Sequence, residues 1–372
     1  MSAIATLAAL PVAALVLWTL LRSRIGGRLV AEPSGERWHD RATPTFGGVG
    51  IFAGFAAGVL VAVAAGAVEP TSELLGVLAG SALLFVAGLV DDLRSLNPLM
   101  KLGAQFAAAG IVLASGLSVE VFGNDVLALV VAVVWLVGIT NAFNLLDNMD
   151  GLAATLAAIA CAYYALDAVT LHPDRVVLVL ALALGLALAG FLPFNLRPGR
   201  SAAVFMGDSG SQVLGFALAA IALSSSWKTA GTTLATTVLP LLILAIPILD
   251  TTLVTLVRLV ERRPVTQGGR DHSSHRLVYY GLSEGKAVAV LAAVATALGA
   301  TGVAYSILDM PRLTLVGVLV TFVLLVQFAT ALADLEERSR RGDAPPDLSL
   351  RALFFQPRRI VEVLVDFGSI CA

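Results

Sequence analysis

Charge is scarce in this chain of 372 residues, of which 13% are Asp, Glu, Lys or Arg and 58% are hydrophobic. A soluble domain typically carries about 25% charged residues, so the composition excludes an ordinary soluble protein. The net charge of −2 gives no reason to expect a nucleic-acid partner. The two cysteines, Cys161 and Cys371, both lie in apolar runs, so we expect neither a disulfide framework nor a zinc site.

Long apolar runs take the place of charge. A run of about 17 or more apolar residues is long enough for a membrane helix. The N-terminal stretch Met1–Leu21 lacks the basic residues of a signal peptide, so we expect it to remain as a membrane helix. The sequence therefore predicts an all-α, polytopic membrane helix bundle of about eleven transmembrane helices. They lie near residues 3–21, 47–68, 74–90, 102–118, 126–146, 153–170, 176–194, 211–227, 231–257, 286–308 and 312–333.

Basic residues concentrate on one side of this bundle. One set of alternate loops, together with the C-terminal tail, holds 21 of the 24 Lys and Arg residues. Because basic loops stay in the cytoplasm, we expect the N-terminus outside and the C-terminus in the cytoplasm. Residues 1–333 would form one membrane-embedded domain and residues 334–372 a cytoplasmic tail. Its last stretch, Ile360–Ala372, is apolar and would be either the start of a further membrane segment or an interfacial helix.

Polar residues gather where the predicted helices reach the cytoplasm. Such residues at the edge of a bilayer are costly to place and usually functional, so we predict a site at this face. Asp250 is the one acid expected deep within a helix, where either helix–helix hydrogen bonding or a catalytic role would explain it. The five polar clusters are Arg37–Gly48, Asp91-Asp92, Asn141–Gly151, Asn195–Ser211 and Arg262–Arg276.

Three aspartates suggest a divalent cation. Asp91 and Asp92 follow an apolar run, and negative charge is disfavoured at a helix C-terminus, so a cation is expected to compensate. Mg²⁺ is typically held by one or two carboxylates together with substrate phosphates. Asp208 opens a later helix, where it would repel a bare phosphate unless a metal lay between them. The alternative is that these acids only cap helices.

Amides and acids are dense at the end of the fifth predicted helix. Asn144, Asp147, Asn148 and Asp150 together suit a polar ligand that has both donors and acceptors. An N-cap for the next helix would explain one of the acids but not the whole set.

The longest cytoplasmic loop holds the sequence Gly268–Leu277. Arginine suits a diphosphate because of its fork of donors, and histidine can ligate a metal or move protons. His272 and His275 are three residues apart and share a face if the segment is helical. A basic loop that merely obeys the positive-inside rule would explain Arg262 and Arg263, but not this spacing.

Taken together, the five clusters resemble the polyprenyl-phosphate N-acetylhexosamine-1-phosphate transferase family, in its undecaprenyl-phosphate N-acetylglucosaminyl-1-phosphate transferase branch. The resemblance runs from about Glu32 to Leu277. The usual histidine motif of the family, H-x-H-H-R, reads His272-Ser273-Ser274-His275-Arg276 here, which puts any role of the middle position in doubt. The remaining motif residues are Pro33, Arg37, His39, Pro44 and Gly47-Gly48; Asp91-Asp92 with Leu96, Pro98 and Lys101; Asn141, Asn144, Asp147, Asp150 and Gly151; and Gly207, Asp208, Gly210 and Ser211.

The resemblance implies transfer of a sugar 1-phosphate from a cytosolic UDP-N-acetylhexosamine to undecaprenyl phosphate, with release of UMP. This step would initiate a cell-envelope glycan at the inner, cytoplasmic membrane. The expected cofactor is Mg²⁺, with Mn²⁺ as the alternative, and the preferred donor is UDP-N-acetylglucosamine. Members of the family often dimerise, so a homodimer is also allowed.

Residue roles follow from the same resemblance. Asp91, Asp92, Asp208 and His272 would be catalytic, and the three aspartates would bind the metal. Whether Asp91 acts as a nucleophile or as a base stays open. The substrate-binding residues would be Arg37, His39, Asn141, Asn144, Asp147, Asn148, Asp150, Asn195, Phe205, His275 and Arg276.

Two other functions compete with this one. The muramoyl-pentapeptide branch of the family is disfavoured because it typically has ten helices and a different histidine loop. An ion-coupled transporter would place acids near the membrane midplane and show paired, broken helices, and neither feature is evident in the sequence.

Overall fold

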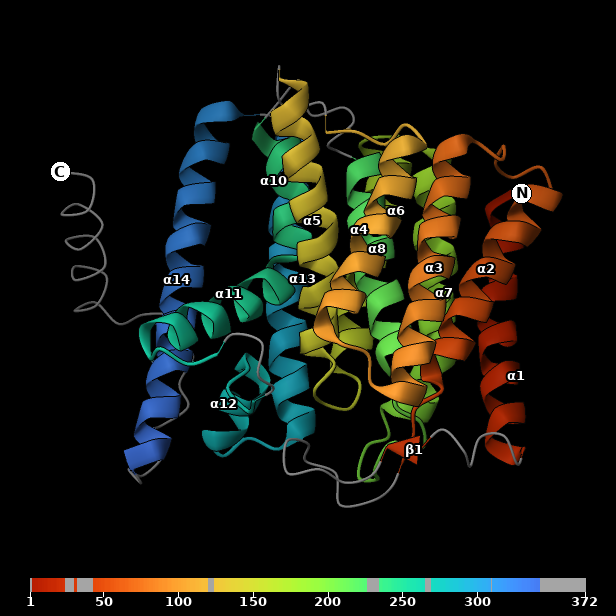
Figure 1. Ribbon diagram of the computed structural model, residues 1–372. Coiled ribbons are helices and arrows are strands. Elements are labelled where there is room, and N and C mark those ends of the chain that lie inside the picture. Colours follow the sequence, from red (N-terminus) through yellow and green to blue (C-terminus); the bar gives the residue numbers. More distant parts are fainter. Residues whose placement is uncertain are drawn as a thin grey trace.

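The computed structural model describes residues 2–23, 30–31, 43–119, 124–225, 234–264, 269–308 and 310–341. These segments form a bundle of long helices, as the composition predicts (Figure 1). Their β-structure is one antiparallel ladder between β1 (Val30–Ala31) and β2 (Thr43–Pro44), in which Val30 pairs with Pro44.

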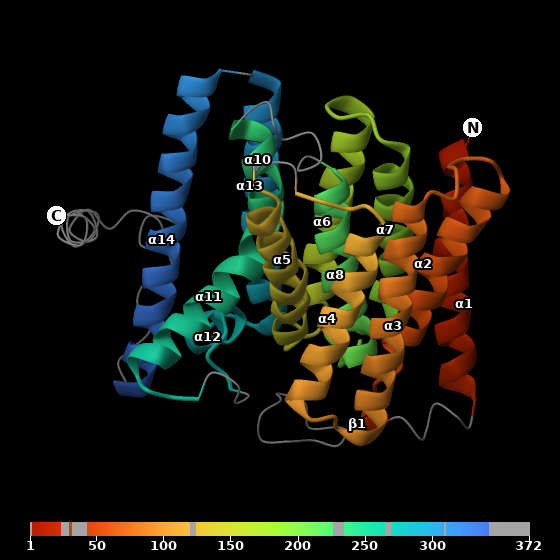
Figure 2. The ribbon, with the colours of Figure 1, turned by 45° about the horizontal axis from the view of Figure 1, so that its top comes forward.

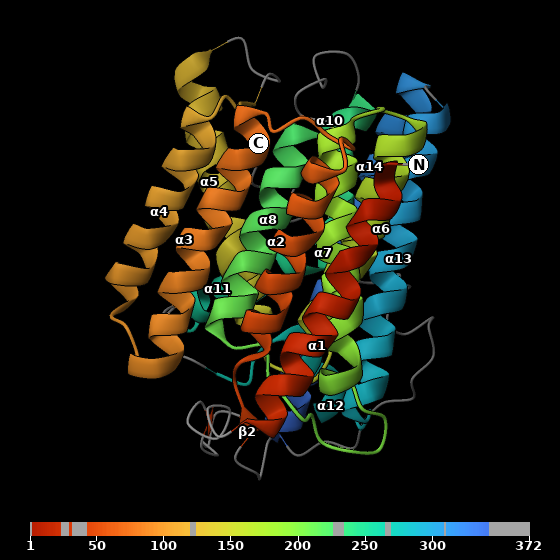
Figure 3. The same cartoon turned by 90° about the vertical axis from the view of Figure 1, so that its right-hand side faces the viewer.

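The first part of the bundle is built around one buried helix. Every residue of α8 from Ser209 to Ser224 is buried, and the helix packs against α2, α3 and α5. Figure 3 shows α8 enclosed by its neighbours. The elements are a 3-10 helix (Ser2–Ala8), α1 (Ala9–Arg22), α2 (Gly47–Ala64), α3 (Ser72–Arg94), α4 (Pro98–Ala114), α5 (Asp125–Leu146), α6 (Leu152–Thr170), α7 (Arg175–Asn195) and α8 (Asp208–Ser224).

The second part holds a sharp bend that the sequence analysis did not predict. The expected single helix over 231–257 is wrong, because α10 (Leu234–Ile243) and α11 (Ala245–Val260) meet at 70°. Pro247 lies in the first turn of α11; it lacks an N–H for the carbonyl of Ile243, and its ring crowds that carbonyl. As a result α11 crosses the direction of the other helices (Figure 1). The short α12 (Ser273–Tyr279), α13 (Glu284–Leu308) and α14 (Pro311–Arg341) complete the fold.

Local sequence sets several helix starts. The side chains of Thr71, Asn97, Asn124 and Asp174 each accept a hydrogen bond from a backbone N–H in the first turn of α3, α4, α5 and α7. Such caps satisfy donors that have no partner within the helix. Pro98 follows Asn97 at the first position of α4, where a missing N–H costs nothing.

Helix lengths and hydropathy identify a multi-pass membrane protein. Within the described residues, eight helices are long and apolar enough to cross a membrane, and the bent pair adds a ninth. Each of the eleven expected runs contains a helix or the bent pair, but α4 and α8 have only 17 residues each. The count of eleven and the direction of the termini therefore stay predictions. The expected domain boundary at residue 333 falls inside α14, which continues to Arg341.

The polar clusters lie at one end of the bundle. The α3–α4, α5–α6 and α7–α8 connections reach the same end as α12 and the β-ladder, at the bottom of Figure 1. The view in Figure 2 shows α11 and α12 beside the lower end of α5. The sequence prediction that separate segments meet at one face is thus confirmed for the described residues.

Candidate active site

A polar cavity opens where these segments meet. Of the predicted site residues, Asp91, Asn141 and Arg276 do not line the cavity, and Arg37 and His39 lie outside the described residues. Ten others line it: Asp92, Asn144, Asp147, Asn148, Asp150, Asn195, Phe205, Asp208, His272 and His275.

Asp92 ties α3 to the start of α8. Its two carboxylate oxygens accept separate backbone N–H groups, Oδ1 from Asp208 at 2.7 Å and Oδ2 from Ser209 at 3.1 Å. The positive end of the α8 dipole therefore compensates the charge that α3 carries at its own C-terminus. Asp92 thus has a positioning contact besides its predicted catalytic role.

Two glycines make this approach of α3 to α8 sterically possible. A Cβ on Gly88 would lie 2.5 Å from the carbonyl oxygen of Asp208, closer than real Cβ contacts. Gly207 has φ of +73°, and a Cβ there would lie 2.7 Å from Oδ2 of Asp92. Only glycine fits both positions without a shift of the backbone.

Lys101 is a site residue to which the sequence analysis gave no role. Its Nζ donates to Oδ2 of Asp208 at 2.6 Å and also forms an ion pair with Asp91. Asp91 accepts a further hydrogen bond from the backbone N–H of Leu96 at 2.5 Å. The ammonium therefore lies between two of the three predicted metal ligands. Lys101 is the one charged residue of α4, and that isolation was the available signal.

Two amides of α5 connect the acids to neighbouring helices. Asn144 Nδ2 donates to Asp208 Oδ1 at 3.0 Å and to Ser211 Oγ at 2.9 Å. Asn141 pairs instead with the amide of Gln105 on α4, through bonds of 2.7 and 3.2 Å. Asn144 thus orients a predicted metal ligand, whereas Asn141 holds α4 against α5.

Other predicted ligand-binding residues also brace the loops. Asn195 is buried; its Oδ1 accepts from Gly151 N at 2.7 Å and its Nδ2 donates to Val204 O at 2.9 Å. Asp150 Oδ2 accepts from Ala202 N at 3.0 Å. These bonds join the α5–α6 and α7–α8 loops, so the cavity wall is fixed in place.

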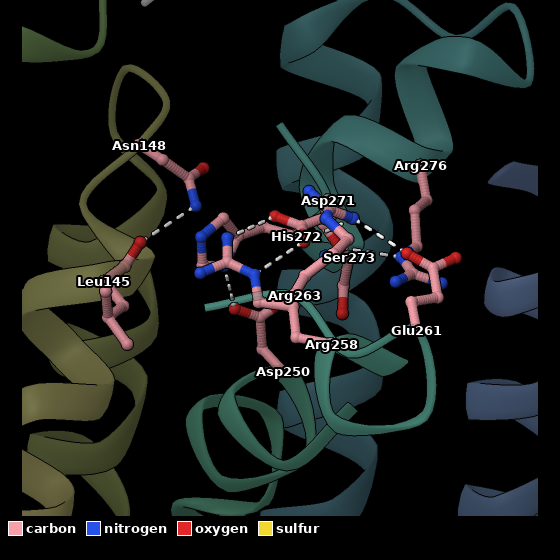
Figure 4. Close-up of polar contacts among 10 residues, drawn as sticks. All are labelled: Leu145, Asn148, Asp250, Arg258, Glu261, Arg263, Asp271, His272, Ser273 and Arg276. Carbon is pink, nitrogen blue, oxygen red and sulfur yellow. Dashed lines mark hydrogen bonds and ion pairs between the residues drawn. The ribbon is translucent and has the colours of Figure 1, made fainter. Parts of the chain in front are cut away.

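The histidine loop is anchored to α11. His272 Nδ1 lies 2.8 Å from Asp250 Oδ2, and Arg258 Nε and a terminal nitrogen donate to the two oxygens of Asp271 at 2.8 and 2.7 Å (Figure 4). Arg276 Nε donates to the backbone carbonyl of Asp271 at 2.7 Å. Arg276 is fully buried behind the cavity, so the structure gives it a bracing contact within the loop.

Charges in this loop are set by burial and by neighbours. Burial alone would raise the pKa of Asp271, but the hydrogen bonds and charge of Arg258 outweigh it and lower the pKa to about 2. Burial and the neighbouring charge of His272 lower the pKa of His275 to about 4. His275 is therefore neutral near pH 7.

Ser274 occupies the position where the family usually has histidine. It is fully buried, and its Oγ donates to Asn148 Oδ1 at 2.7 Å, joining α12 to the α5–α6 loop. A histidine here would have to displace that contact.

The donor set fits a divalent cation. No group of three or more His, Cys, Asp or Glu side chains within the described ranges is arranged to hold a metal. Asp91 and Asp208 nevertheless contact the same ammonium, so both carboxylates reach one cationic position. Two carboxylates completed by substrate phosphates are a typical Mg²⁺ environment. The metal roles of Asp91, Asp92 and Asp208 stay predictions.

The expectation that Asp250 is the one acid deep within a helix is wrong. Asp167 on α6 is also fully buried, near the other end of the bundle. It accepts from Ser225 Oγ at 2.7 Å and lies 2.7 Å from His172 Nδ1. His172 lies only five residues after Asp167, but Ser225 lies 58 residues away, so the sequence offered no sign of that second contact.

Known proteins share the sequence that builds this site. Residues 74–226 match the model of glycosyl transferase family 4. A probable undecaprenyl-phosphate N-acetylglucosaminyl 1-phosphate transferase of Bacillus subtilis is 33% identical over 271 residues, covering 70% of this chain and 73% of its own length. A decaprenyl-phosphate N-acetylglucosaminephosphotransferase of Mycobacterium tuberculosis is 30% identical over 363 residues, covering 88% and 87%.

A second branch is also similar. A phospho-N-acetylmuramoyl-pentapeptide-transferase of Lactobacillus delbrueckii is 36% identical over 233 residues, covering 56% of this chain and 70% of its own length. The first two relatives are at least 30% identical and are covered over more than two thirds of their length. The segment that matches the family model contains Asp92, Asn144 and Asp208 of the cavity. The chain belongs to glycosyl transferase family 4, the sugar-phosphate transferases that its five polar clusters resemble.

Proposed function

We propose that this protein transfers N-acetylglucosamine 1-phosphate from UDP-N-acetylglucosamine to a polyprenyl phosphate. An oxygen of the acceptor phosphate forms a bond to the β-phosphorus, the anhydride bond to the α-phosphate breaks, and UMP leaves. The observation that carries the proposal is the convergence of acids, amides and histidines from separate segments at one end of a membrane bundle. The names of the relatives from Bacillus subtilis and Mycobacterium tuberculosis support the same sugar and acceptor class.

The donor would occupy the polar cavity. Asn144, Asn148 and the acids of the α5–α6 loop offer donors and acceptors that suit a uracil and a ribose. Phe205 lines the same cavity and offers an aromatic face for a base. The fixed loops keep these groups in place before the substrate binds, which lowers the entropy cost of alignment.

A bound divalent cation would neutralise charge on the transferring phosphate, which is the main requirement of phosphoryl transfer. Asp91 and Asp208 would hold it, with Mg²⁺ as the expected ion and Mn²⁺ as the alternative. Asn144 and the α8 N-terminus would keep Asp208 oriented, and Lys101 supplies positive charge next to the same carboxylates.

The lipid acceptor has a separate path. An apolar groove of about 520 Å³ lies between α5 and the bent α10–α11 pair. Its walls are suited to a prenyl chain, since burying apolar surface is favourable and few polar groups line it. Ala142 at the groove is two residues from Asn144, which binds Asp208. The groove therefore reaches the same end of α5 as the proposed cation site, although Ala142 and Asn144 point to different faces of that helix.

The cellular setting follows from the substrates. A nucleotide sugar is cytosolic and a polyprenyl phosphate is embedded in lipid, so we place the cavity at the cytoplasmic face of the inner membrane. The basic loops at this end of the bundle support that orientation. Initiation of a cell-envelope glycan and a homodimer remain predictions. A transporter is disfavoured because the acids of the cavity lie at one end of the bundle.

Release of UMP tests the proposal. Purified protein is incubated with undecaprenyl phosphate, Mg²⁺ and, in separate arms, UDP-N-acetylglucosamine, UDP-N-acetylgalactosamine or UDP-N-acetylmuramoyl-pentapeptide. We expect UMP in the first arm. UMP only in the last arm would assign the chain to the muramoyl-pentapeptide branch. No UMP in any arm, from protein with an intact helical spectrum, would refute the transferase function.

A further inference from the structure

Asp250 is a buried acid that the proposed reaction does not use. It has no exposed surface and lies on α11, far in sequence from the acids of the cavity. The 70° bend before Ala245 turns α11 across the bundle (Figure 1). Asp250 on this helix contacts His272 and Ser273 of the histidine loop. An acid at such depth is rarely kept without a partner and a role.

Both oxygens of Asp250 contact the start of α12. His272 Nδ1 donates to Oδ2 at 2.8 Å, and the backbone N–H of Ser273 donates to Oδ1 at 2.6 Å (Figure 4). Two bonds to adjacent residues fix both the loop and the plane of the imidazole. Because Nδ1 is engaged with α11, Nε2 is the ring nitrogen left for the cavity that His272 lines.

The surrounding charges favour an imidazolium. Asp250 and Asp271 act on the ring as anions, and Arg258 opposes them. The ring of His275, on which the charge of Arg270 acts, lies 5.9 Å away. Burial alone would lower the pKa of His272, but the two carboxylates outweigh it and hold the pKa above its ordinary value. Arg258 pairs with Asp271 through two hydrogen bonds, which leaves His272 as the partner that balances Asp250.

The cavity is acidic, so a cationic donor within it would favour binding of a diphosphate. Asp92, Asp147, Asp150 and Asp208 line the cavity, and a diphosphate would be repelled by them. With His275 neutral, His272 is the one cationic side chain among the described residues that line it. A charged N–H donor is about twice as strong as a neutral one toward an anionic oxygen.

We propose that Asp250 is a positioning residue that fixes the ring of His272 and keeps it protonated, so that Nε2–H is a permanent cationic donor for the diphosphate of the nucleotide sugar. The inference rests on the proposed function for its ligand, but not for the state of the ring. His272 is then an anchor that stays charged through the reaction, and it does not exchange its proton with the substrates.

Asp250→Asn tests this role, because asparagine preserves the shape of the side chain and removes its charge. Asparagine has one acceptor for the two donors His272 Nδ1 and Ser273 N, so we also expect a loss of stability, and all activities are compared per folded protein. Without the carboxylate the pKa of His272 falls to its ordinary value of about 6.5 or below. We expect kcat/KM for UDP-N-acetylglucosamine to be within about twofold of wild type at pH 5.5. Above about pH 6.5 it should fall roughly tenfold per pH unit through a rise in KM, while wild type holds its value to higher pH. Asp250→Glu, which restores the charge, should recover part of the loss at pH 8.

Asp167→Asn is the matched control. Asp167 is equally buried and also pairs with a histidine, His172, but at a distance from the cavity. The pH profile of this variant should match wild type after correction for folded protein. A uniform loss in Asp250→Asn at every pH, or the same alkaline loss in Asp167→Asn, would show that Asp250 is merely structural.

Two measurements separate the inference from the proposed reaction. NMR of labelled histidine, with the His272 signal assigned by its absence in His272→Gln, reads the ring whether or not UMP is formed. We expect the titration of that signal to move to lower pH in Asp250→Asn, and an unmoved titration would overturn the inference. The second measurement is kcat/KM at pH 8. The double variant with Asp250→Asn and His272→Gln should be less than twofold below His272→Gln alone, because the effects of residues that act as one unit are not additive. Additive losses would contradict it.

Discussion

The contact of Asp92 with α8 makes a sharp prediction for stability. Asp92→Asn replaces one carboxylate oxygen by an amide NH₂ and leaves the shape unchanged. In the native protein each oxygen accepts a different backbone N–H, from Asp208 and from Ser209. Asparagine has one acceptor, so one of these N–H groups must face a second donor.

The magnitude follows from the two interactions that are lost. A buried donor left without an acceptor costs about 1–3 kcal/mol. Removing a negative charge from the N-terminus of a helix costs about 0.3–1 kcal/mol. We therefore expect Asp92→Asn to lower the free energy of unfolding by about 1.3–4 kcal/mol. Because Asp208 belongs to the same turn of α8, turnover should also be lost.

Asp174→Asn is the control, since Asp174 also caps a helix with two bonds. There a single oxygen, Oδ1, accepts from Val176 N at 2.7 Å and from Val177 N at 3.0 Å. Asparagine keeps that oxygen and both hydrogen bonds, so only the charge at the helix N-terminus is lost and we expect a change of at most about 1 kcal/mol. Reversible unfolding of the detergent-solubilised protein measures both variants. If Asp92→Asn destabilises no more than Asp174→Asn, the two-oxygen contact is not what holds α8.

Four further predictions concern the site. Lys101→Met should lower the melting temperature without Mg²⁺ and make the rise on adding Mg²⁺ larger than in wild type; equal rises would argue against a shared cation position. Asp208→Asn should abolish UMP release with an unchanged helical spectrum, and near-normal turnover would remove it from the catalytic residues. Ser274→His overfills a buried position, so we expect a loss of about 1–3 kcal/mol in unfolding free energy, which an unchanged denaturation midpoint would contradict. Because the pKa of Asp271 is lowered to about 2 from 3.8, the advantage of wild type over Asp271→Asn in thermal melts should persist from pH 7 to pH 4 and shrink only toward pH 2; a loss near pH 6 would contradict the pairing with Arg258.

Local patterns in the sequence predicted the fold well. Apolar runs located the helices, because in lipid each spanning backbone must satisfy its own hydrogen bonds. The spacing of polar residues such as Asn144, Asp150 and Asp208 placed them at helix ends, and alternate helix ends meet at one face. The bend at α10–α11 was not predicted because Pro247 lies within an unbroken apolar run. Hydropathy measures how apolar a residue is, and does not show that proline lacks the backbone N–H that a helix needs.

Contacts between residues far apart in the chain could not be predicted from the sequence. Lys101 lies 107 residues from Asp208, and Asp250 lies 22 residues from His272, so only the packing of helices brings each pair together. Asp92 illustrates the same limit. Its position at a helix end was visible, but its bond to the start of α8 depends on the close approach that Gly88 allows.

The central claim is that the bond between the two phosphates of the donor is broken. UDP-N-acetylglucosamine labelled with ³²P in the β-phosphate tests it directly, with undecaprenyl phosphate and Mg²⁺ present. The account predicts that the label enters the lipid fraction and that unlabelled UMP is released in equal amount. Label that stays with the nucleotide, as UDP, would mean that the sugar alone is transferred and would contradict the account.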